Sequence, residues 1–167
     1  MASPLVTLLL MTYRQEPFVR EAVRSALAQD YQPLQIIISD DASPDRTFEV
    51  IAEETHGYRG PHEVQIRRNA ERRRSIRHME EAVSLARGEL VVTAHGDDVS
   101  VARRVTALVE AWRRERVSMV SSRVRIIDRN GGRSMAVNED VPSRRIPPEE
   151  IVGEIWLTQM LGATLAM

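Results

Sequence analysis

Cysteine and lysine are both absent from this chain, and aromatic residues make up only 4% of it. Without cysteine the protein has no disulfide, no thiolate zinc site and no cysteine nucleophile, and a reducing compartment is permitted. Without lysine it contains neither a phosphate-binding loop that ends in lysine nor a Schiff-base lysine. The scarcity of aromatic residues and the formal net charge of -1 argue against nucleic acid as a partner.

Long apolar runs are also absent, and no segment approaches the length of a transmembrane helix. The apolar run at residues 5–11 lacks the basic start and the small-residue cleavage site of a signal peptide. The 167 residues, 43% of them apolar, fit one globular domain over residues 1–167. We therefore predict a single cytoplasmic domain.

Short apolar runs alternate with amphipathic helical patterns along most of the chain. Ser43 and Ser100 are predicted to cap the second and fourth helices, and Gly88 is predicted to follow the third helix as its C′ residue. This alternation is typical of a doubly wound α/β fold, in which the carboxyl ends of the parallel strands share one edge. The predicted strands are 5–11, 34–39, 64–66, the run after Gly88, and 117–122; the predicted helices are 18–27, 44–55, 71–87 and 101–112.

The last third of the chain carries weaker patterns. The sequence predicts a hairpin from Val124 through the turn Asn130-Gly131-Gly132, then a loop at 142–148 and a helix at 149–160. The chain stops inside the apolar run 161–167, where domains seldom stop. This ending predicts that the polypeptide is a fragment of a longer protein.

Two pairs of adjacent carboxylates follow predicted strands at the shared edge. Asp40 and Asp41 follow the second strand, and Asp97 and Asp98 follow the fourth. Paired carboxylates at such an edge either hold a hard divalent cation or belong to a solvated turn, and the residues alone leave both readings open.

Three blocks of this sequence together resemble the family 2 glycosyltransferases. They are residues 4–13 (PLVTLLLMTY), residues 38–47 (ISDDASPDRT), and a third block that begins with residues 88–92 (GELVV) and ends with residues 96–98 (GDD). The resemblance implies a Rossmann-like GT-A fold with a mostly parallel sheet flanked by helices. It also implies inverting transfer of a sugar from a nucleotide-diphosphate donor, aided by Mn²⁺ or Mg²⁺.

The resemblance places base recognition at Tyr13 and Asp41, with Thr12 and Asp40 beside them. A planar ring and a directional carboxylate acceptor suit a nucleotide base. Tyr13 could instead serve only the fold as a core edge, and Asp40 as a turn acceptor. Many family members carry Asn where this chain has Arg14.

The same resemblance makes Asp98 the direct metal ligand and places Asp97 at the ribose, with Asp97 as a further metal candidate. His95 stands where many relatives have Asp. Its imidazole could bind Mn²⁺, or it could be an uncharged strand residue that forms a hydrogen bond.

Six arginines cluster around the start of the predicted third helix. Positive charge there opposes the helix dipole unless an anion compensates it, and a diphosphate is one such anion. The alternative is a solvated basic face. We select Arg74 and Arg77 as nucleotide-binding candidates from the set Arg67, Arg68, Arg72, Arg73, Arg74 and Arg77.

The general base that the family requires is expected beyond Met167, because the segment 162–164 resembles only the start of the acceptor region. Glu139 and Asp140 are interpreted as loop residues. UDP is the favoured nucleotide by family habit, and the acceptor could be a glycan, a lipid or a protein. The full-length protein could associate peripherally with a membrane.

Two other functions compete with this hypothesis. One is a noncatalytic module that binds a nucleotide sugar. The other is a nucleotidyltransferase of similar fold, which usually needs a glycine-rich phosphate loop after the first strand, where this chain has the segment 13–16 (YRQE).

Overall fold

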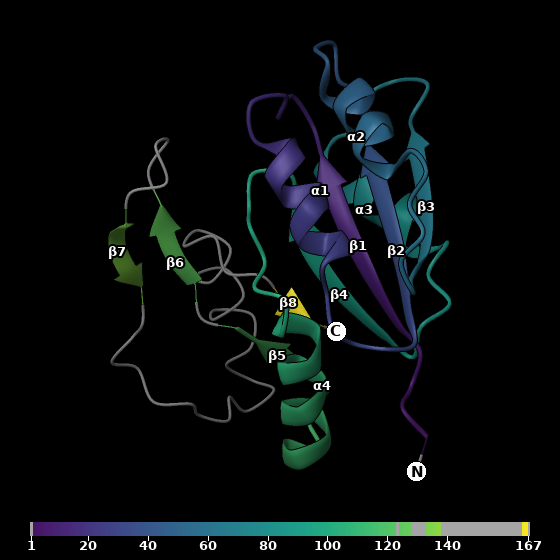
Figure 1. Ribbon diagram of the computed structural model, residues 1–167. Helices are drawn as coiled ribbons and strands as arrows, with labels where there is room; N and C mark the ends of the chain where they lie inside the picture. Colours follow the sequence, from purple (N-terminus) through teal and green to yellow (C-terminus); the bar gives the residue numbers. More distant parts are fainter. Residues whose placement is uncertain (1, 123, 128–132, 138–164, 167) are drawn as a thin grey trace.

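The computed structural model describes residues 2–122, 124–127, 133–137 and 165–166. Its main sheet contains β1 (Val6–Thr12), β2 (Leu34–Asp40), β3 (Glu63–Arg68), β4 (Leu90–His95), β5 (Val120–Ser121) and β8 (Leu165–Ala166). The spatial order is β3-β2-β1-β4-β8-β5 (Figure 1). The strands β3, β2, β1 and β4 are parallel to one another, whereas β8 runs antiparallel to β4 and β5.

Four helices cover the two faces of this sheet: α1 (Val19–Leu27), α2 (Thr47–Thr55), α3 (Ser75–Val83) and α4 (Arg104–Glu115). Leu8 and Leu10 of β1 belong to the apolar cluster with α1, α2 and α4, and Leu9 packs in the second cluster with α3 (Figure 1). Because both faces of β1 are buried, its side chains are apolar at almost every position. The predicted doubly wound sheet is confirmed.

The carboxyl ends of the parallel strands lie level with one another. Thr12 of β1 pairs with Asp40 of β2, and Asp40 in turn pairs with Arg68 of β3. On the other side, Met11 pairs with His95 at the end of β4. The segments that follow these strands therefore begin at one edge, as the sequence predicted.

Two of the predicted helix caps are wrong. The helices α2 and α4 begin at Thr47 and Arg104, several residues later than predicted, and no side chain caps either one. The hydroxyl of Ser43 instead donates to Asp40, and the hydroxyl of Ser100 accepts a hydrogen bond of 3.4 Å from Arg104. Both serines are thus engaged in contacts that differ from those of a helix cap.

The third helix is shorter than the predicted range 71–87, since α3 ends at Val83 with Ser84 as its C-cap. Gly88 is therefore not a C′ residue, and the prediction for it is wrong. A Cβ at Gly88 would lie 2.5 Å from the backbone nitrogen of Thr7 and 2.8 Å from the carbonyl carbon of Val6. Glycine is needed here because the chain passes directly against β1.

The predicted hairpin is present in the backbone as β6 (Val124–Ile127) and β7 (Arg133–Val137), which form a separate two-stranded sheet. The main sheet gains its antiparallel strand from β8, which the sequence did not predict. The predicted turn at 130–132, the loop at 142–148, the helix at 149–160, the pair Glu139 and Asp140, and the segment 162–164 lie outside the described residues. Among the described helices, none has the length and apolar character needed to cross a membrane.

We predict that Gly88→Ala destabilises the protein, because the new methyl group would collide with backbone atoms that cannot move freely. The expected loss is about 1–3 kcal/mol in the free energy of unfolding, measured by urea denaturation. Gly57→Asn is the control, since Gly57 has φ +68° with open space around it, a conformation that asparagine tolerates. Equal stability of Gly88→Ala and the wild type would contradict the close-packing argument.

Candidate functional site

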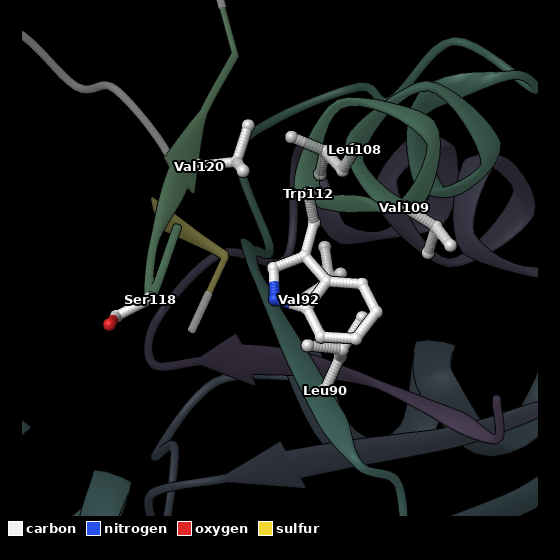
Figure 2. A pocket seen from close by; sticks show the side chains of 7 residues that line it. All are labelled: Leu90, Val92, Leu108, Val109, Trp112, Ser118 and Val120. Atoms are coloured by element: carbon white, nitrogen blue, oxygen red, sulfur yellow. The ribbon is translucent and has the colours of Figure 1, made fainter. Parts of the chain in front are cut away.

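One apolar crevice lies between β4, α4 and β5 (Figure 2). Its lining side chains carry no ionisable group, so it offers nothing that would hold a metal ion or a phosphate. The lining residues are Leu90, Val92, Leu108, Val109, Trp112, Ser118 and Val120. The polar groups that could bind a charged ligand lie elsewhere, at the carboxyl edge of the parallel strands.

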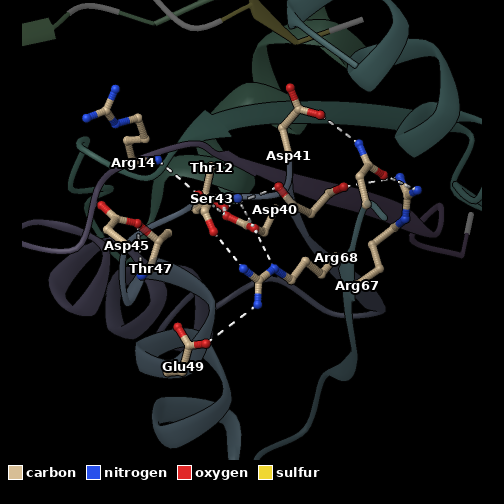
Figure 3. A network of polar contacts seen from close by, with 12 residues as sticks. Thr12, Arg14, Asp40, Asp41, Ser43, Asp45, Thr47, Glu49, Arg67 and Arg68 are labelled. Atoms are coloured by element: carbon tan, nitrogen blue, oxygen red, sulfur yellow. Dashed lines mark hydrogen bonds and ion pairs between the residues drawn. The ribbon is translucent and has the colours of Figure 1, made fainter. Parts of the chain in front are cut away.

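Asp40 sits at the centre of a buried polar network at this edge (Figure 3). Its side chain is fully buried and accepts hydrogen bonds from the Thr12 hydroxyl (3.1 Å), the Ser43 backbone N–H (2.9 Å) and the Ser43 hydroxyl (2.5 Å). Arg68 approaches from β3, with its Nε 3.6 Å from the carboxylate. All of these partners belong to the protein, so Thr12 and Asp40 hold the ends of the strands together in this conformation.

Asp41 has a different set of partners, although it is also buried. Its carboxylate accepts hydrogen bonds from the Asn69 side chain (2.8 Å) and from the backbone N–H groups of Arg73 (2.7 Å) and Arg74 (2.9 Å). Burial raises the pKa of Asp41, but the donors at Arg73, Asn69 and Arg74 outweigh it and leave the pKa below its ordinary value. Asp41 is therefore held as an anion.

Tyr13 lies next to Asp41, because the backbone N–H of Asp41 donates to the carbonyl of Thr12, the residue before Tyr13. The guanidinium carbon of Arg72 is 4.0 Å from the centroid of the Tyr13 ring. This distance is typical of a cation–π contact. The ring of Tyr13 thus has one face that already accepts a flat, polar group.

Asp97 and Asp98 follow β4 and are both exposed. Although Asp98 is exposed, loss of hydration among neighbouring protein atoms raises its pKa, and the charge of Asp97 adds to the effect. His95 and Arg104 act in the opposite direction. Within the described ranges, no three histidine, aspartate or glutamate side chains converge into a metal-ligand cluster. His95 therefore does not complete such a cluster with Asp97 and Asp98.

Arg104 is a buried cation close to these carboxylates. Its guanidinium donates to the carbonyl of Thr93 (2.8 Å) and to the hydroxyl of Ser100 (3.4 Å). Burial lowers the pKa of Arg104 to about 10, and the negative charge of Asp98 partly opposes this shift. Arg104 remains protonated at neutral pH and supplies a fixed positive charge behind the pair.

The six arginines around α3 divide into two groups. Arg67, Arg68 and Arg73 form ion pairs with carboxylates of the protein. Among the described residues, no carboxylate lies within ion-pair distance of Arg72, Arg74 or Arg77, and all three are exposed. The last two are the arginines selected from the sequence.

Four residues at this edge were missed by the sequence reasoning: Gln15, Asn69, Arg72 and Arg104. Asn69 directly follows β3, so the rule that selected Asp40 and Asp97 would have found it. Arg72 lay within the arginine cluster, but nothing in the pattern linked it to Tyr13. Gln15 contacts Asp97, which lies 82 positions away in the chain.

Comparisons with known proteins show the family and the fold of this chain. The family model described as Glycosyl transferase family 2 matches residues 7–161. EpsE of Bacillus subtilis (strain 168), which carries a provisional glycosyltransferase name, is 25% identical over 142 residues. That match covers 84% of this chain and 50% of EpsE, so the chain spans about half the length of this relative.

Two solved structures show the same fold. The mannosyltransferase PcManGT from Pyrobaculum calidifontis, in complex with GDP-Man and Mn²⁺, has a TM-score of 0.65 and 26% identity. The comparison covers 75% of this chain and 36% of that one. TarS of S. aureus in complex with UDP-GlcNAc gives a TM-score of 0.59 at 18% identity, covering 68% of this chain and 32% of that chain. The Rossmann-like GT-A fold is confirmed.

We predict that Asp41→Asn lowers stability, because an amide cannot accept hydrogen bonds from all three of these donors. The expected loss in unfolding free energy is about 1–3 kcal/mol near pH 7. Since the pKa of Asp41 is lower in the folded state, this contribution is present above the unfolded pKa. It disappears as the pH falls below about 4.

Urea denaturation between neutral and acid pH would measure this difference. Glu80→Gln on the exposed side of α3 is the control and should change stability little at any pH. A difference between wild type and Asp41→Asn that does not depend on pH would contradict the role of the ionised carboxylate.

Proposed function

Because the chain belongs to glycosyl transferase family 2, we propose that it forms the donor-binding part of an enzyme that transfers a sugar from a nucleotide diphosphate. The observation that carries this proposal is the convergence of an aromatic ring, a buried carboxylate and an exposed carboxylate pair at one sheet edge. In open α/β sheets this edge is where ligands bind. UDP-GlcNAc and GDP-Man in the complexes of TarS and PcManGT support the class of donor.

Tyr13, Arg72 and Asp41 form the proposed site for the base. A base would stack on the Tyr13 ring, and the Arg72 guanidinium marks a face that takes planar groups. One oxygen of Asp41 accepts two hydrogen bonds, whereas Oδ2 accepts one, from Arg74. A carboxylate oxygen has two lone pairs, so Oδ2 retains capacity for a ring N–H.

Uracil offers such an N–H beside two carbonyl groups, and we therefore favour UDP. We assign Thr12 and Asp40 a supporting role, because every contact of their side chains in this conformation is internal.

Asp97 and Asp98 suit a hard divalent cation. Mg²⁺ and Mn²⁺ prefer oxygen ligands, and Mg²⁺ is commonly held by one or two carboxylates together with substrate phosphates. Loss of hydration and, after it, the charge of Asp97 raise the pKa of Asp98, and a bound cation would favour its ionised form. We propose Asp98 as the metal ligand and Asp97 as its neighbour at the ribose.

A divalent cation at this position would act as a Lewis acid that neutralises charge on the departing nucleotide diphosphate. Arg74 and Arg77, which have no carboxylate partner among the described residues, would add positive charge on the diphosphate side. We place the general base of an inverting reaction outside this chain, so the chain should bind donor better than it transfers sugar.

We predict that isothermal titration detects binding of UDP in the presence of Mn²⁺. Asp98→Asn should weaken this binding at least tenfold, about 1.4 kcal/mol, because the charged ligand to the cation is lost. Asp30→Asn, at an exposed carboxylate in the segment that follows α1, is the matched control. Unchanged binding in Asp98→Asn would reject the metal assignment.

Substitutions of Tyr13 test the base site. Tyr13→Phe keeps the ring and should bind UDP as the wild type does, whereas Tyr13→Ala should lose about 1–3 kcal/mol of binding free energy. Titration of both variants at the same Mn²⁺ concentration measures the difference. If Tyr13→Ala binds as tightly as Tyr13→Phe, the ring does not stack on the base.

A further inference from the structure

The side chain of Gln15 connects two parts of the proposed site. Its Nε2 donates a hydrogen bond of 2.8 Å to Oδ1 of Asp97. Its Oε1 accepts the backbone N–H of Tyr13 at 3.2 Å. One carboxamide therefore contacts both the residue proposed to stack on the base and the carboxylate pair proposed for ribose and metal.

The backbone of Gln15 is fixed on several sides. Its N–H donates to the hydroxyl of Thr47 (2.8 Å), and its carbonyl accepts the N–H groups of Phe18 and Val19 at the start of α1. The carboxamide lies directly over Gly96, where a Cβ would come within 2.5 Å of Oε1. The side chain is thus held between a fixed backbone and a glycine that leaves room for it.

A neutral amide is well suited to orient a carboxylate next to a cation site. It donates a hydrogen bond to Asp97 without adding positive charge. An arginine at the same place would neutralise the Asp97–Asp98 pair and repel a divalent cation. Gln15 therefore holds one oxygen of Asp97 while the negative charge of the pair remains available.

We propose that Gln15 is a positioning residue that aims Asp97 and couples the base end of the donor site to the metal end. This inference rests on the proposed function, since it assigns a role at the same site. It predicts that loss of the carboxamide lowers the affinity for Mn²⁺. It also predicts a weaker effect of Mn²⁺ on UDP binding, because linked sites affect each other reciprocally.

The test is Gln15→Met, which has similar length but no amide, beside Gln65→Met in the exposed part of β3 as a matched control. Binding of Mn²⁺ alone is measured by electron paramagnetic resonance, and UDP affinity is measured with and without Mn²⁺. We expect Gln15→Met to lose about tenfold in Mn²⁺ affinity, as for outer partners of metal ligands. The factor by which Mn²⁺ improves UDP binding should fall with it, while Gln65→Met should match the wild type in both measurements.

Equal Mn²⁺ affinity and equal coupling in Gln15→Met and wild type would overturn the inference. A second measurement does not depend on any ligand. In the ligand-free protein, Asp97→Asn should displace the side-chain amide resonances of Gln15, and Asp30→Asn should not. Absence of this displacement also overturns the inference. Failure of the wild type to bind UDP or Mn²⁺ would instead reject the proposed function. The amide resonances would still show whether the side chain of Gln15 contacts Asp97.

Discussion

The fully buried carboxylate of Asp40 is the constraint on which this edge of the sheet depends. A buried charge is costly unless donors surround it, and here the donors come from Thr12 of β1, from Ser43 after β2, and from Arg68 of β3. Satisfying one carboxylate therefore holds the ends of three strands in register. Tyr13 directly follows Thr12, and Asp41 directly follows Asp40, so both residues of the proposed base site are positioned by this network. Asp40 can thus set the geometry of that site without contacting the base.

The two pairs of carboxylates at the strand ends lie in opposite environments. Asp41 is buried, but its donors lower its pKa, whereas Asp98 is exposed and its pKa is raised by lost hydration and by Asp97. Donors of the protein already stabilise the charge of Asp41, so this carboxylate offers a ligand a directional hydrogen-bond acceptor. The second pair is under-compensated, because Arg104 donates to Thr93 and Ser100 and forms no ion pair with either carboxylate. This difference supports the proposal that a cation binds at Asp97 and Asp98 and not at Asp41.

The parts of the fold that could be predicted from sequence are those set by local pattern. The strands β1 and β2 carry nearly continuous apolar runs because both of their faces are covered, and that signal is visible in the residues themselves. The caps at Ser43 and Ser100 failed because side chains engage their hydroxyls, that of Asp40 at Ser43 and that of Arg104 at Ser100. Gly88 was misread because its constraint comes from β1, 81 positions away at Thr7. The predicted positions of Tyr13, Asp41, Asp97 and Asp98 follow from strand ends. The contacts of Gln15 and Arg72 depend on how loops meet, which no local pattern contains.

The backbone of Arg74 shows how the two ends of the site depend on each other. Arg74 has φ 66° and ψ 169°, a backbone conformation that residues other than glycine rarely adopt. It costs on the order of 1–3 kcal/mol. Its N–H and that of Arg73 are bound by Asp41, which offsets this strain and places the start of α3. The carboxylate proposed for the base therefore also positions the segment that carries Arg72, Arg74 and Arg77. A ligand that changed the hydrogen bonds of Asp41 would act on this strained residue directly, so base recognition and the placement of positive charge for the diphosphate share one structural support.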